Sequence, residues 1–186
     1  MDEPIETFAR IKEFVGFTAG DAENLVNLGP LFDVYGPRLT DAVEAKLRAT
    51  PELAPLLHDR VDALRSAYAR WMSELFQGEY GAAYYERRFQ IGLAHARADI
   101  APHWCESVLS VVRSGSLVAL ATVYIDPNEF AAHVQSLCKI LDLDQMIINT
   151  AYQQERLARL CRFTGMSRTL IERCIATAGK GPRRDP

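Results

Sequence analysis

The sequence lacks most of the short motifs that would assign a function directly. Its four cysteines form no CxxC pair, so they indicate neither a zinc site nor a disulfide framework, and we expect reduced, mostly buried thiols. The formal net charge of −3 argues against a nucleic-acid-binding protein, which usually carries a basic stripe. There is also no GxGxxG, P-loop or GxSxG pattern, so the common nucleotide-binding and hydrolase signatures are missing.

Long apolar runs and targeting signals are scarce as well. The N-terminus reads MDEPIETF, which is acidic and lacks the apolar centre of a signal peptide. The most apolar run, residues 107–125, is interrupted by the stretch from Arg113 to Ser116 and falls short of a membrane span. We therefore expect a cytoplasmic protein with no membrane or nucleic-acid partner.

Helical spacing of apolar residues dominates what is present. Thr18, Asp59 and the pair Asp126-Pro127 are N-terminal helix signals, while Gly78 and Gly165 mark ends or interruptions. Residues 107–125 have a β-branched composition that would also suit a hairpin, but the absence of other strand signals favours a buried helix. The predicted helices cover residues 6–15, 18–28, 30–49 with a break or kink at Gly36-Pro37, 51–57, 59–76, 79–100, 102 onward, 107–125, 126–163 and 167–178.

The predicted helix over residues 126–163 is much longer than the usual three turns. Its apolar residues form more than one stripe, so more than one side must be covered. One stripe is Phe130, Val134, Leu137 and Leu141, and the residues off it are Ile140, Leu143, Ile147 and Ile148. The cover is either the rest of the same chain or a second copy, and the pattern leaves both open.

A glycine precedes a histidine by one turn on the helix over residues 79–100. Tyr84, Arg88, Ile91, Gly92 and His95 are spaced by three or four residues and share one face. A glycine inside a helix costs about 1 kcal/mol relative to alanine, but it allows a flat object to lie close to the backbone. A haem fits this arrangement, with His95 on the iron and Arg88 on a propionate. The alternative is an ordinary packed or solvated histidine.

The same region resembles a known family. The run GEYGAAYYERRFQIGLAHARADIAPHW, residues 78–104, is similar to the proximal region of globin-coupled sensors and protoglobins. Similar residues also occur in the preceding helix and in KLRATPEL, and the run LCKILDLDQMIINTAYQQERL looks like the last globin helix, through which members dimerise. The matching residues are Leu64, Trp71, Phe76, Gly78, Tyr84, Arg88, Ile91, Gly92, His95, Pro102 and Trp104, within a resemblance over residues 14–160.

The resemblance implies an all-α, globin-like sensor fold with an extra N-terminal helix and a long C-terminal helix. It implies a sensor globin domain over residues 1–163, followed by a C-terminal helix and tail over 164–186 that could begin a signalling linker. The implied cofactor is haem b, its iron held by His95, and the implied ligand is O2, CO or NO. The implied partners are a second copy, bound through the C-terminal helices, and an output partner or domain. The implied cofactor-binding residues are His95, Arg88, Gly92, Ile91, Tyr84, Leu64, Ala67, Tyr68 and Trp104.

One departure from the family pattern concerns the gas-binding side. Family members usually have Phe-Tyr ahead of the KLRATPEL-like segment, where this chain has Val43 and Glu44. The usual hydrogen-bond donor to the gas is therefore missing, and Tyr68 or Tyr35 could replace it. Leu64 and Ala67 would form the wall on that side.

Two other functions compete with a gas sensor that is not an enzyme. The first is a globin-fold protein-interaction module without haem, for which loss of the distal aromatic pair would be expected. The second is haem-based catalysis, which would need a distal acid–base group such as Glu44 or His58.

Overall fold

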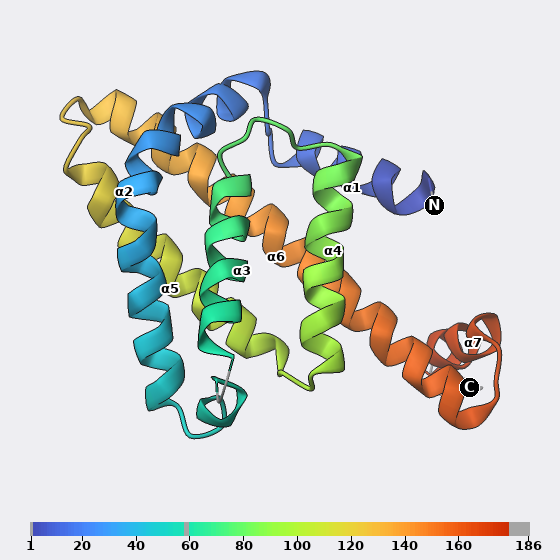
Figure 1. The fold of residues 1–186 in the computed structure, drawn as a ribbon. Helices are drawn as coiled ribbons and strands as arrows, with labels where there is room; N and C mark the ends of the chain where they lie inside the picture. The colour runs from blue at the N-terminus through green and yellow to red at the C-terminus, as the bar shows by residue number, and fades with distance from the viewer. Residues whose placement is uncertain (1, 58–59, 179–186) are drawn as a thin grey trace, which may run out of the picture.

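The computed structural model describes residues 2–57 and 60–178, which are helical over most of their length (Figure 1). No strand occurs in these ranges, so residues 107–125 do not form a hairpin and the predicted all-α class is confirmed. The elements are α1 (Asp2–Phe14), α2 (Ala19–Ala49), the 3-10 helix η1 (Ala54–Leu57), α3 (Val61–Glu74), α4 (Ala82–Arg97), α5 (Pro102–Ala121), α6 (Pro127–Thr164) and α7 (Arg168–Ala178).

Local signals fix several of these helix ends. Thr18 and Asp21 form a reciprocal capping box at the start of α2. The Asp126 carboxylate accepts hydrogen bonds from the backbone N–H groups of the next turn, and Pro127 occupies the first position of α6. Gly165 ends α6 in the left-handed conformation, with φ of 70°. Asp59, the predicted cap of α3, lies outside the described residues.

The predicted break between residues 28 and 30 is wrong, and at Gly36-Pro37, where a break or a kink is predicted, the helix does not break. Helix α2 continues through Pro30 and Pro37, although Figure 1 shows it bending along its length. Each proline removes one backbone hydrogen bond and crowds the preceding turn, which bends a helix more readily than it ends one when the proline faces solvent. Both prolines are exposed, while the opposite face of α2 is buried in the core.

Helix α6 is the central element of the fold. It crosses diagonally behind α3 and α4 in Figure 1 and packs most extensively on α4, then on α5 and α2. Leu137, Ile140, Leu141 and Leu143 are completely buried by these helices. The monomer itself therefore covers the middle of α6, and Leu141 belongs to the core rather than to a surface available to a second copy.

The C-terminal part of α6 extends past the other helices, and α7 folds back beside it (Figure 1). Phe163 near this end is 90% exposed, and Leu160 is 41% exposed. The unpaired apolar surface of α6 is thus at its C-terminal end.

Among the described helices, α5 is the one whose length and composition would allow it to span a membrane. In this fold its buried residues instead pack against α2 and α6. Its apolar character is accounted for by that packing.

Candidate functional site

His95 lies near the C-terminal end of α4 and is half-buried. Its Nδ1 is 2.8 Å from the carbonyl oxygen of Ile91, one turn earlier. Because a carbonyl can only accept, Nδ1 carries the proton of this hydrogen bond, and in the neutral ring Nε2 keeps a lone pair. Metal-binding histidines are commonly oriented by such a hydrogen bond from the other ring nitrogen.

The helices next to α4 carry half-buried apolar side chains. Ile91 on α4, Tyr68 on α3, and Val108 and Val111 on α5 pack against the core without being fully enclosed by it. Leu64 and Trp104 are also half-buried, whereas Ala67 is exposed on α3. Of the predicted distal wall, Leu64 and Tyr68 are therefore partly covered by the chain and Ala67 is exposed, and the role of all three stays a prediction.

Tyr68 brings the hydroxyl of a half-buried ring to this region. No hydrogen bond among those of the described residues involves its hydroxyl. Burial raises the pKa of Tyr68, and the nearby thiol of Cys105 raises it further. Its ring meets the indole of Trp71 edge-on, with centroids 6.4 Å apart. A tyrosine hydroxyl without a protein partner can donate to a ligand or to water.

Cys105 connects this region to α6 and to the end of α4. Its Sγ is 3.4 Å from the hydroxyl of Tyr152 on α6. That hydroxyl donates to the carbonyl of Ile100, 2.8 Å away, and the Ile100 N–H in turn donates to the carbonyl of His95. Residues from α3, α5 and α6 therefore converge near the C-terminal end of the helix that carries His95.

The predicted role of Gly92 as a seat for a flat cofactor is wrong. Helix α6 occupies that position: a Cβ on Gly92 would lie 2.7 Å from the Cβ of Ala151 and 2.9 Å from the carbonyl oxygen of Ile148. Both distances are shorter than van der Waals contact. Gly92 is needed because α4 and α6 cross backbone to backbone at this point.

The predicted pairing of Arg88 with a propionate is also wrong, as is cofactor contact by Tyr84. The Arg88 side chain is completely buried, and its Nε donates to Asp144 of α6 at 2.9 Å. The other guanidinium nitrogens bond the Glu74 carboxylate and the Trp71 carbonyl of α3. The Tyr84 hydroxyl also donates to Asp144. Both side chains lie on the face of α4 that turns toward α6.

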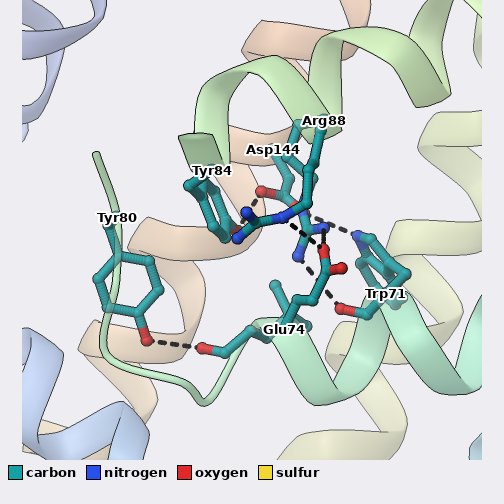
Figure 2. A network of polar contacts seen from close by, with 8 residues as sticks. Trp71, Glu74, Tyr80, Tyr84, Arg88 and Asp144 are labelled. Carbon is teal, nitrogen blue, oxygen red and sulfur yellow. Dashed lines mark hydrogen bonds and ion pairs between the residues drawn. The ribbon is translucent and has the colours of Figure 1, made fainter. Parts of the chain in front are cut away.

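These side chains form one buried cluster, here called the Asp144 network: Trp71, Glu74, Tyr84, Arg88 and Asp144 (Figure 2). Asp144 accepts from the Trp71 indole N–H at 2.8 Å, as well as from Tyr84 and Arg88. Burial raises the pKa of Asp144, against the lowering effect of the Arg88 charge and the donated hydrogen bonds. The network joins α3, α4 and α6 at a single carboxylate.

Sequence reasoning did not identify Asp144 as important. The available signal was a carboxylate within the apolar run that includes Leu141, Leu143, Ile147 and Ile148. A charge at a buried helix position requires a partner of opposite charge from another element. The sequence prediction places Arg88 on a haem propionate and therefore does not pair it with Asp144.

Val43 and Glu44, which stand where the family usually has Phe-Tyr, have different surroundings. Val43 is buried, whereas Glu44 bonds Arg48 and Arg65 at the junction of α2 and α3. Hydrogen bonds from Arg65 and Arg48 lower the pKa of Glu44. The Tyr35 hydroxyl lies 3.2 Å from the Thr122 hydroxyl of α5, within hydrogen-bonding distance. Neither Glu44 nor Tyr35 is therefore free to act at the His95 region, and His58 lies outside the described residues.

Comparison with known proteins agrees with this fold. The family model described as Protoglobin matches residues 6–158. Among solved structures, the globin domain of the Geobacter sulfurreducens globin-coupled sensor is similar, with a TM-score of 0.75 and 31% sequence identity. The match covers 77% of this chain and 96% of that domain.

Proposed function

Because the chain belongs to the protoglobin family, we propose that this globin sensor domain binds haem b through His95 and senses a diatomic gas. The observation that carries the proposal is the His95 ring itself, whose Nδ1–H is bound to Ile91 and whose Nε2 is free to hold iron. When bound, haem supplies an iron site for O2, CO or NO. The half-buried Ile91, Tyr68, Val108 and Val111 are suited to cover an apolar ring system.

The first test is the spectrum of the purified protein and of the His95→Ala variant. We expect a Soret band that shifts when the reduced protein is exposed to CO, and stoichiometric haem loss in His95→Ala with helicity retained. His133→Ala is a matched control, because His133 also bonds the carbonyl one turn earlier but lies near the start of α6. A variant that keeps the wild-type haem spectrum without His95 would show that the ligand is misassigned.

We further propose that Tyr68 is the hydrogen-bond donor on the gas-binding side. Among the described residues no hydrogen bond involves its hydroxyl, whereas Glu44 and Tyr35 are engaged elsewhere. O2 gains partial negative charge on binding and depends on such a donor, while CO accepts hydrogen bonds weakly.

Tyr68→Phe should therefore weaken O2 binding by about 1–3 kcal/mol, or roughly 5- to 150-fold, and leave CO affinity nearly unchanged. Tyr35→Phe removes an equivalent hydroxyl on the outer side of α2 and should change neither affinity. The ratio of O2 to CO affinities from stopped-flow kinetics provides the measurement. Equal losses for both gases would indicate a packing effect and contradict the donor role.

The proposed signalling form is a homodimer that contacts through the C-terminal helices and acts on an output partner or domain. Since Leu141 is buried in the monomer, the contact must use exposed positions such as Phe163. We expect Phe163→Glu to shift the sedimentation coefficient toward the monomer. Phe14→Glu alters an equally exposed phenylalanine on α1 and should leave the dimer intact. Identical behaviour of both variants would place the dimer contact elsewhere.

A globin-fold interaction module without haem is the second candidate. It is favoured by the packing roles of Gly92 and Arg88, since two residues of the family-like motif are explained by the fold alone. One experiment distinguishes the haem-binding sensor from the module without haem. A protein that gains no Soret band when haem is added would be the interaction module.

A further inference from the structure

The Asp144 network links the two helices that flank the proposed gas site. Trp71 of α3 is three residues beyond Tyr68 and in edge contact with its ring. Arg88 of α4 lies two turns before His95. Both donate to the same oxygen of Asp144, at 2.8 Å and 2.9 Å respectively. A single carboxylate oxygen on α6 thus receives one donor from each side of the site (Figure 2).

The contacts allow little independent movement of these helices. Arg88 also bonds the Trp71 backbone carbonyl, which ties α4 to α3 directly. One turn beyond Arg88, α4 meets α6 at Gly92, with no space even for a Cβ. Because packed interfaces are stiff, a shift of α3 or α4 must either be carried by α6 or alter the hydrogen bonds at Asp144.

We propose that the Asp144 network is the element that transmits the state of the gas site to α6. The proposal rests on haem binding at His95. A ligand that displaces Tyr68 or His95 changes the balance of donors on Asp144, so the Trp71 indole hydrogen bond differs between the gas-bound and gas-free states. Asp144 and Trp71 act as positioning residues in this scheme, since neither touches the ligand. From Asp144 the same helix continues to the exposed Phe163.

The chain allows a direct test because Trp71 and Trp104 are its only tryptophans. Ultraviolet resonance Raman bands of tryptophan report the strength of the Nε1–H hydrogen bond. We expect a difference between the reduced protein with and without CO that disappears in Trp71→Phe. A wild-type protein without this difference, or a difference that survives in Trp71→Phe, would overturn the proposal.

The second measurement is CO affinity. Asp144→Asn keeps the shape of the side chain and removes its charge. It should change CO affinity by at least about fivefold, the lower end of typical coupling between sites. Tyr80→Phe is a matched control, since it removes a buried hydroxyl bond to the Leu75 carbonyl beside the network and should leave affinity unchanged (Figure 2). If Asp144→Asn does not fold, Trp71→Phe takes its place, with the same expected change.

The outcomes distinguish this proposal from the proposed function. A protein without a Soret band refutes both. A normal Soret band and CO binding, together with an unchanged Trp71 signal and unchanged affinities, refutes only transmission through Asp144. In that case the network only holds α3, α4 and α6 together and does not respond to the gas.

Discussion

Replacing Asp144 by alanine is expected to reduce the free energy of unfolding by about 3–5 kcal/mol, because it removes the fully buried one of the two carboxylates that pair with a buried guanidinium. Arg88 is completely buried and would keep only Glu74 as a counter-ion. The Trp71 indole and Tyr84 hydroxyl would also lose their acceptor. Three donors, from Trp71, Tyr84 and Arg88, would thus lose their shared acceptor at once.

The measurement is thermal or urea unfolding followed by circular dichroism. For a chain of this size the expected loss corresponds to a fall in Tm of roughly 6–20 °C. Asp142→Ala is the matched control on the same helix. Its carboxylate is 63% exposed and pairs with Arg113 at the surface, an interaction worth about 0–1 kcal/mol. Equal losses for the two variants would mean that the network contributes no more than a surface ion pair.

A double variant separates the desolvation effect from the pairing effect. Replacing Arg88 by leucine together with Asp144→Ala removes both buried charges, so the combined loss should be smaller than the sum of the two single losses. Additive losses would contradict direct coupling between the two side chains.

Local signals are sufficient to predict several helix ends. The capping box at Thr18 and the Asp126-Pro127 pair act within one turn, so they can be read without knowing what packs nearby. The prolines of α2 were misjudged, because whether a proline breaks a helix depends on the packing of the opposite face. That face is buried in the core and holds the helix together.

The lack of information about packing partners also explains why the roles of Arg88 and Gly92 at the candidate site were predicted wrongly. Helical spacing correctly put Arg88 and Gly92 on a shared face, but it cannot reveal what lies opposite. The opposite element is α6, whose Ala151 lies 59 residues after Gly92 in the chain. Periodicity also showed that α6 is covered on more than one side, without showing that its own chain provides the cover. Those are tertiary properties, whereas the His95–Ile91 hydrogen bond is local to α4.

Because α4 contacts α6 at Gly92, the expected effect of Gly92→Ala on the free energy of unfolding is opposite to that of the same substitution in an exposed helix. In an exposed helix, glycine to alanine stabilises by about 1 kcal/mol. We expect Gly92→Ala instead to destabilise the protein by about 1–3 kcal/mol, the usual range for overpacking. The added Cβ would meet the Cβ of Ala151 at 2.7 Å and backbone atoms of Ile148 at 2.9 Å and 3.0 Å. Backbone atoms cannot turn aside, so the two helices must separate.

The control for Gly92→Ala is Gly20→Ala in the first turn of α2, where the nearest atom to an added Cβ is the Thr18 hydroxyl at 3.6 Å. This variant should be neutral or slightly stabilising. Adding Ala151→Gly to Gly92→Ala removes the closest clash but not those with Ile148. The Gly92→Ala loss should therefore be smaller in that background without vanishing, with a coupling of about 0.5–3 kcal/mol. Unfolding in urea of Gly92→Ala, Ala151→Gly, their double variant and Gly20→Ala measures this, and a stabilised Gly92→Ala protein would show that the helices do not cross here.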